Sequence, residues 1–292
     1  MSTSLLRPCP IHAPDLLLSL PLGFRKSGII TNIPAPISEK SSMADPLPIT
    51  PASDGSVRTE LAVAHHDTIL MREIVSLKHR TVREATNAIG MLESALDALF
   101  RLDPDAARHV VERDDEIDAE EVDIEESLFR LLSLHQPFAR DFRAILTLVK
   151  VNADIERAAD HAKTIGKLAI RLCDLGVPVW PTALQELGQR VPILCHSLLN
   201  ALQREDVDTA GSVLARDKLI DNLDKRLFDE ALDLMGDDRD SRAVGMLLYR
   251  CGRELERVGD LMTNIAEDII YLVTGSIVRH RRKRDRQGPP PP

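Results

Sequence analysis

The sequence is poor in aromatic residues: its 292 residues include 1 Trp, 2 Tyr and 6 Phe, or 3%. Because β-strands rely on aromatic and β-branched side chains, this composition disfavours a β-sandwich or a β-barrel. The chain is instead rich in alanine, leucine and charged residues, which favour helices. A hydrophobic content of 43% is enough to form a sizeable core. We therefore expect an all-α protein.

Cysteine pairs, long apolar runs and common catalytic motifs are also absent. The 4 cysteines are widely spaced and match no zinc pattern, which indicates a reduced, cytoplasmic protein. No apolar run approaches the roughly 18 residues that a membrane span needs. Residues 16–22 are apolar but contain Pro21, so we expect no signal peptide. Neither a phosphate-binding loop nor a nucleophile elbow occurs, and we expect no enzymatic activity.

The net charge of the chain is negative and unevenly distributed. Lys and Arg number 37 against 46 Asp and Glu, a net charge of -9. Nucleic-acid-binding proteins usually show the opposite balance, so we expect no nucleic-acid partner. Residues 279–286 carry a net charge of +5 and residues 1–58 one of +1, which leaves -15 on residues 59–278. The excess of acid therefore lies in the part of the chain that we expect to fold.

The chain divides into two tails and a helical middle. Residues 1–58 are rich in Pro, Ser and Thr without periodicity and are predicted to be a disordered extension. Residues 279–292 form a basic, proline-rich tail, which is either solvated or binds an acidic partner or anionic lipid. Between them, helical periodicity and breaking residues predict six helices, at about 60–101, 104–135, 138–174, 182–204, 206–236 and 240–274. Long helices with short links form antiparallel bundles.

The six helices repeat as three plus three. The pattern Arg113-Asp114-x-x-Ile117-Asp118 recurs 103 residues later as Arg216-Asp217-x-x-Ile220-Asp221. The pattern Glu156-Arg157-x-x-Asp160 recurs 100 residues later as Glu256-Arg257-x-x-Asp260. Two matches in the same order at nearly one offset predict a duplication. We expect two tandem three-helix bundles related by pseudo-two-fold symmetry, spanning residues 59–176 and 177–278.

In four of the predicted helices, placing successive residues 100° apart puts apolar residues and carboxylates on one line along the helix surface. Adjacent carboxylates at the edge of a core repel one another, which is costly unless a cation neutralises them. Arg157 and Arg257 lie about 100° off these lines and are poor partners. Two interpretations remain open: two acidic lines that bind a metal, or a solvated acidic face with Arg bridges. The candidate metal ligands are Asp114, Asp118, Glu121, Glu156, Asp160, Asp217, Asp221, Asp224, Glu256 and Asp260.

The residue types on these lines restrict the metal. No Glu-x-x-His occurs before any of the 9 histidines, which disfavours a ferritin-like di-iron site. Ligands that are all oxygen suit hard cations, namely Mg, Mn, Ca or ferric iron. His161 follows Asp160 directly but lies off the line, and we expect it at the surface.

Taken together, these motifs resemble the PhoU family of phosphate-transport accessory proteins. The resemblance covers about residues 60–275, and its combination of motifs is specific although each fragment alone is not. It rests on Asp114-x-x-Ile117-Asp118-x-x-Glu121-x-x-Ile124-Glu125, Gln136-Pro137-x-x-x-Asp141-x-Arg143, Asp154-Ile155-Glu156-Arg157-x-x-Asp160, Leu255-Glu256-Arg257-Val258-Gly259-Asp260-x-x-x-Asn264-Ile265-Ala266-Glu267 and Ile270-Tyr271-Leu272-Val273-x-Gly275.

The resemblance implies metal clusters of iron, Mg or Mn held by Asp/Glu-x-x-x-Asp motifs. It implies a negative regulator of the phosphate-starvation response that modulates phosphate uptake and forms homodimers. The implied partners are the sensor histidine kinase and the ATP-binding subunit of the phosphate importer, so any membrane contact would be peripheral. A metal-dependent phosphohydrolase and a metal-free helical adaptor are the alternatives.

The two repeats differ from each other. Ala158-Ala159 stands where the second repeat has Val258-Gly259, and Thr164 stands where it has Asn264. The second repeat has Phe228 in the place of Glu125 and lacks a Gln-Pro before its last helix. These differences predict that the two sites differ in affinity or in metal.

Overall fold

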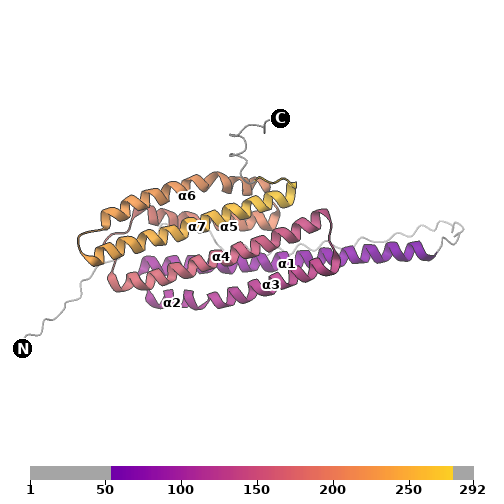
Figure 1. Cartoon of the computed structure of the whole chain (residues 1–292), viewed down its shortest axis with the longest axis horizontal. Coiled ribbons are helices and arrows are strands. Elements are labelled where there is room, and N and C mark those ends of the chain that lie inside the picture. The colour runs from indigo at the N-terminus through magenta and orange to yellow at the C-terminus, as the bar shows by residue number, and fades with distance from the viewer. Residues whose placement is uncertain (1–53, 279–292) are drawn as a thin grey trace, which may run out of the picture. The chain divides into compact units, whose positions relative to one another are not determined.

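A computed structural model describes residues 54–278, with side chains from residue 68 onward. The predictions for the rest of the two tails lie outside the described residues. Within them the chain forms helices and no strands, which confirms the all-α expectation (Figure 1). The elements are α1 (Asp54–Arg101), α2 (Pro104–Glu112), α3 (Asp114–His135), α4 (Ala139–Leu175), α5 (Thr182–Arg204), α6 (Val207–Leu234) and α7 (Arg239–Thr274).

The helix predicted over 104–135 is wrong in one respect, because it is broken into α2 and α3. Arg113 separates the two helices, and its carbonyl accepts a 3.3 Å hydrogen bond from the N–H of Glu116, three residues later. This tighter turn is not marked by Gly or Pro, so the sequence gives no sign of it. The residue that follows the break, Asp114, is only 1% exposed.

The other helix ends follow sequence signals. Asp103 caps α2 through its side chain, which accepts the N–H groups of Asp105 and Ala106, and Pro104 opens the helix as expected. Asp206 and Asp238 cap α6 and α7 in the same way. Gly275 ends α7 with a φ of +70°, in the left-handed region that favours glycine. The first helix begins at Asp54, before the predicted start near residue 60.

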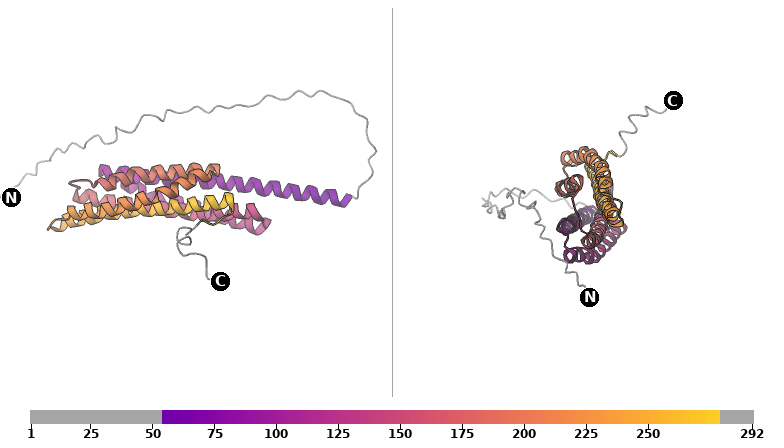
Figure 2. Two further views of the ribbon diagram at one scale, coloured as in Figure 1. Left: turned by 90° about the horizontal axis from the view of Figure 1, so that it is seen from above. Right: turned by 90° about the vertical axis from the view of Figure 1, so that its left-hand side faces the viewer.

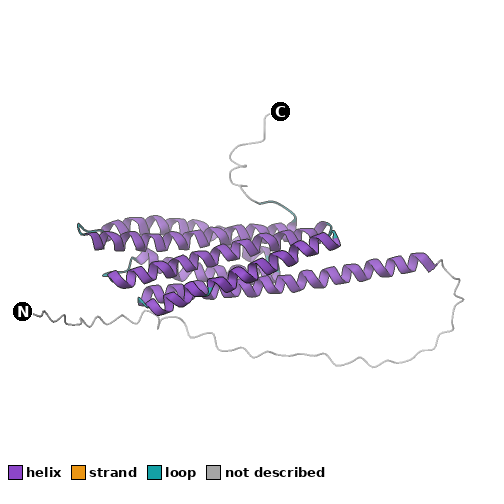
Figure 3. Cartoon of the chain, turned by 60° about the horizontal axis from the view of Figure 1, so that its bottom comes forward, coloured by secondary structure: helices purple, strands orange, loops and turns teal. Residues whose placement is uncertain are grey.

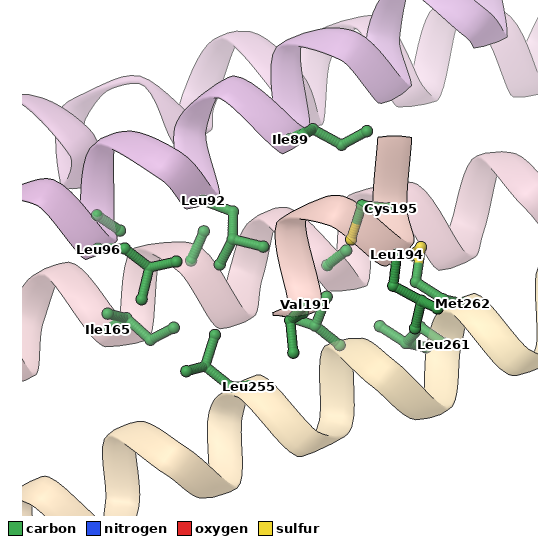
Figure 4. Packing of buried hydrophobic residues seen from close by; sticks show 14 of the residues in the cluster. Ile89, Leu92, Leu96, Ile165, Val191, Leu194, Cys195, Leu255, Leu261 and Met262 are labelled. Carbon is green, nitrogen blue, oxygen red and sulfur yellow. The ribbon is translucent and has the colours of Figure 1, made fainter. Parts of the chain in front are cut away.

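One apolar core joins the two predicted repeats. Side chains from α1, α4, α5 and α7 interdigitate in it, among them Leu92, Ile165, Val191 and Leu255 (Figure 4). The helix α4 packs along α7, and α1 contacts α5, so neighbouring surfaces of both repeats are buried against each other. The described residues, 54–278, therefore belong to one compact unit. The boundary between residues 176 and 177 stays a prediction about sequence repeats.

A second, smaller core lies between α1, α3 and α4. Ile117 of α3 belongs to the main core and Ile124 to the smaller one, so Asp118 and Glu121 fall between the two along the helix. The N-terminal part of α1 extends beyond the ends of the other helices (Figures 2 and 3). The acidic stretch of α3 thus lies beside the junction of the two cores.

Candidate metal centres

The carboxylates of α3 and α4 come together as predicted from their lines. We call Asp114, Asp118, Glu121, Glu156 and Asp160 the first acidic cluster. Burial, and then the charges of Asp114 and Asp160, raise the pKa of Asp118. Burial, and then the charges of Asp160, Asp118 and Glu121, raise the pKa of Glu156. Because each helix acts on the carboxylates of the other, the two acidic lines share one surface.

A second acidic cluster lies on α6 and α7 and consists of Asp217, Asp221, Asp224, Glu256 and Asp260. Burial, and then the charges of Asp217 and Asp221, raise the pKa of Asp260. Burial, and then the charge of Asp260, raise the pKa of Glu256. The structure therefore assembles all ten predicted ligand residues into two groups of five, one in each repeat.

Each cluster contains one basic residue that the acidic lines did not include. Lys163 of α4 donates a hydrogen bond to Oδ2 of Asp114 in the first cluster. In the second, Nη1 of Arg253 donates to Oδ2 of Asp224 at 3.0 Å and lies 3.2 Å from Oε2 of Glu256. A sequence signal exists for both, because Lys163 follows Asp160 by three residues and Arg253 precedes Glu256 by three, which places each pair on one helix face.

The carboxylate oxygens that accept no hydrogen bond from Lys163 or Arg253 suit a hard cation. Oδ1 of Asp114 and Oδ1 of Asp224 are buried and accept no hydrogen bond. A buried carboxylate oxygen without a donor is costly, and a bound cation would remove that cost. Within the described residues, one group of three carboxylates brings its oxygens within 4.8 Å of one another: Asp114, Asp115 and Asp118. Asp115 is an addition to the predicted ligands, and it directly follows Asp114 in the sequence.

The Arg residues of the repeated motifs lie outside the clusters, as their angle predicts. Nη1 of Arg157 donates to Asp154 at 3.0 Å, and Arg257 lies 3.7 Å from Glu254. The expectation that His161 lies at the surface is wrong. Its side chain is 19% exposed and its Nδ1 lies 2.7 Å from Oε2 of Glu254, because α7 packs over this face of α4.

Other parts of the described structure offer no comparable site. A cavity of about 30 Å³ between α1, α4, α5 and α7 is lined by apolar side chains and by Cys195. Burial raises the pKa of that thiol to about 12, so it remains protonated and unreactive. None of the described helices combines the length and the hydrophobicity needed to cross a membrane.

The raised carboxyl pKa values predict how stability depends on pH in chelator-treated protein. A raised folded-state pKa means that the folded chain holds its protons more tightly than the unfolded chain. Glu156, Asp221 and Glu256 then stabilise the fold fully below the ordinary carboxyl pKa of about 4, and this stability is lost as the pH rises through the raised values. We expect the melting temperature to rise by a few degrees from pH 7 to pH 5.

Glu205 limits how far the melting temperature rises as the pH is lowered. The hydrogen bond from Lys78 lowers the pKa of Glu205, so its contribution is present at pH 5 and is lost at more acid pH. Asp221→Asn should flatten the rise between pH 7 and pH 5, because it removes one of the repelling charges. A melting temperature that falls over this interval, measured by circular dichroism, would contradict the electrostatic account.

Comparison with known proteins places the chain in a family. A family model described as "PhoU domain" matches the chain twice, at residues 81–169 and 184–269. A Clostridium acetobutylicum protein named as a phosphate-specific transport system accessory protein PhoU homolog is 33% identical over 217 residues, 72% of this chain and 96% of that protein. A homolog from Pseudomonas aeruginosa is 37% identical over 192 residues, 65% of this chain and 78% of that protein.

Solved structures agree with the sequence matches. The crystal structure of PhoU from Pseudomonas aeruginosa superimposes with a TM-score of 0.68 at 32% identity, covering 70% of this chain and 99% of that one. The phosphate transport system regulatory protein PhoU from Streptococcus pneumoniae gives a TM-score of 0.66 at 27% identity, with 72% and 99% covered. With two family-model matches that together exceed half of its length, the chain belongs to the PhoU family.

Proposed function

We propose that the protein is a metal-binding, non-enzymatic regulator of phosphate transport, which restrains the phosphate-starvation response when phosphate is plentiful. The observation that carries the proposal is the pair of acidic clusters, one in each repeat, in a chain of the PhoU family. The named relatives are accessory proteins of a phosphate-specific transport system. No phosphate loop or nucleophile elbow points instead to an enzyme.

The proposed metal ions are hard cations, of which iron, Mg and Mn are the candidates. The ten carboxylates of the two clusters would hold them, with Asp115 as a further ligand of the first cluster. When bound, the ions would supply positive charge that neutralises the repelling carboxylates. The residues of this chain would position that charge along α3 and α4 and along α6 and α7.

The proposed partners are the sensor histidine kinase of the phosphate response and the ATP-binding subunit of the phosphate importer. The names of the relatives describe a phosphate transport system, which supports the transporter subunit as a partner. The kinase is proposed from the family resemblance. We further propose that the protein acts in the cytoplasm as a homodimer and meets the membrane only through these partners. This part rests on the family resemblance.

The regulatory role is tested in cells of the protein's own host that lack its gene and carry a phosphate-starvation reporter. We expect the reporter to be active in rich phosphate without the protein and silent when the full chain is restored. The double variant Asp118→Asn/Asp221→Asn, which weakens one ligand set in each cluster, should leave the reporter active at normal protein levels. As a matched control, Asp233→Asn at an exposed position of α6 should silence it fully.

Two results would overturn parts of the proposal. Full repression by the double variant would show that the clusters do not serve regulation. Capture of the tagged full chain from phosphate-replete cells without the kinase or the ATP-binding subunit would remove the proposed partners. Turnover of a phosphomonoester by Mn²⁺-loaded protein, lost in Asp118→Asn, would replace the regulator by a phosphohydrolase.

A further inference from the structure

The two acidic clusters carry their internal cation at opposite ends. The repeat offsets pair Asp114 with Asp217 and Lys163 with Thr263. In the first cluster, Lys163 donates to Asp114. In the second, the hydroxyl of Thr263 donates to Oδ1 of Asp217 at 3.2 Å, and the cation is at the other end, on Arg253. The position equivalent to Arg253 in the first repeat is Ala153.

Lys163 occupies the end of the first cluster where the carboxylates are closest. Its hydrogen bond to Asp114, together with the charges of Asp160 and Asp118, raises the pKa of Lys163. The ammonium group therefore contacts Asp114 and interacts electrostatically with Asp160 and Asp118. A divalent ion that binds there must either displace it or tolerate a positive charge close by, and at a separation of about 5 Å even a water-like dielectric makes that repulsion worth about tenfold in affinity.

Asp114 has one carboxylate oxygen that accepts a hydrogen bond and one that does not. Asp114 is 1% exposed, and one of its oxygens accepts Lys163 while the other, Oδ1, is buried without a hydrogen bond. One carboxylate oxygen from each of Asp114, Asp115 and Asp118 lies within 4.8 Å of the other two. Asp217, the counterpart of Asp114, is half-buried, and among the described residues no Lys, Arg or His forms an ion pair with it, with Asp221 or with Asp260.

We propose that Lys163 is a built-in competitor of the metal, so that the second cluster fills first and the first cluster fills only as Lys163 is displaced. The inference rests on the metal binding proposed above and adds an order of filling. It assigns the order of filling to one pair of residues, Lys163 and Thr263, at the Asp114 and Asp217 ends of the clusters, whereas Arg253 and Ala153 differ at the other ends. Because the two clusters fill at different cation concentrations, the protein responds to two concentration ranges instead of one.

The test is a titration of the full-length, chelator-treated protein with Mn²⁺, in which free Mn²⁺ is measured by electron paramagnetic resonance. The wild type should show two classes of site. Lys163→Thr should tighten the weaker class by about tenfold, and Thr263→Lys should weaken the tighter class by about tenfold. The exchange variant Lys163→Thr/Thr263→Lys should show two classes again, with their positions reversed.

Single-cluster variants assign the classes. In the wild type, Asp221→Asn should remove the tighter class and Asp118→Asn the weaker one, and in the exchange variant these effects should be interchanged. Lys167→Thr is the matched control, because Lys167 is exposed on α4 one turn further on. It removes the same charge from the same helix and should change neither class by more than about twofold.

Each outcome bears on the inference. If Lys163→Thr leaves both classes unchanged or weakens one, Lys163 is not a competitor, while the metal binding itself stands. If the wild type and every variant bind no Mn²⁺, metal binding and the inference both fail, although the regulatory role can still be judged from the reporter. Thr263→Lys keeps the test decisive if Lys163→Thr fails to fold, since an ammonium group can take the place of the hydroxyl that Thr263 donates to the half-buried Asp217.

Discussion

The substitution Leu255→Ala should lower the free energy of unfolding by about 2–5 kcal/mol, because it opens a cavity in the core that both repeats share. Leu255 is 0% exposed and lies on α7 opposite residues of α1 and α4 (Figure 4). Neighbours from several helices hold the site open, so collapse around the missing atoms is limited. Equilibrium denaturation with urea, followed by circular dichroism, measures the loss.

The same helix provides a control for this prediction. Val273 of α7 is 42% exposed, and Val273→Ala should change the stability by no more than about 0.5 kcal/mol. The slope of the free energy against urea should be unchanged in both variants, which would show that the extent of unfolding is the same. Two separate unfolding transitions, of which the first unfolds only α5, α6 and α7, would contradict a core shared between the repeats.

Removal of the ammonium group in Lys163→Met should destabilise the chelator-treated protein by about 2–3 kcal/mol. Asp114 would keep its buried carboxylate and lose its partner, and a broken buried ion pair typically costs about 3–5 kcal/mol. The expected value is smaller because the side chain of Lys163 is 23% exposed. Thermal or urea unfolding in the presence of a chelator measures the difference.

A double-mutant cycle separates the ion pair from packing. Asp114→Asn in the Lys163→Met background should recover most of the loss, since it removes the unpaired charge. Lys167→Met at the exposed position of the same helix should have almost no effect. If Lys163→Met left the stability unchanged with Asp114 intact, the hydrogen bond from Lys163 would not stabilise the fold.

The lines of carboxylates could be predicted from the sequence because they continue apolar lines at a helical spacing. Asp118 and Asp221 lie beside the buried residues Ile117 and Ile220, so the periodicity that places the core also places the charges. The duplication then groups the lines in pairs. For these reasons the fold and the membership of the two clusters follow from residue spacing.

The features that the sequence did not predict depend on contacts between helices. The hydrogen bond from Lys163 to Asp114 depends on how α4 is rotated against α3, which a single helical pattern does not fix. His161 is covered because α7 packs over its face of α4. The break at Arg113 has no Gly or Pro to mark it, and its backbone angles, φ of -72° and ψ of -15°, remain close to helical.

The core shared by α1, α4, α5 and α7 has a consequence for the evolution of the chain. Duplicated modules can often be separated, exchanged or lost one at a time, because each has an interior of its own. Here the two copies have become interdependent, since Leu92 of the first and Leu255 of the second help to exclude water from the same space. Amide hydrogens in α1 should therefore exchange with solvent only when α7 also opens, and an ion held by one copy should slow exchange in the other.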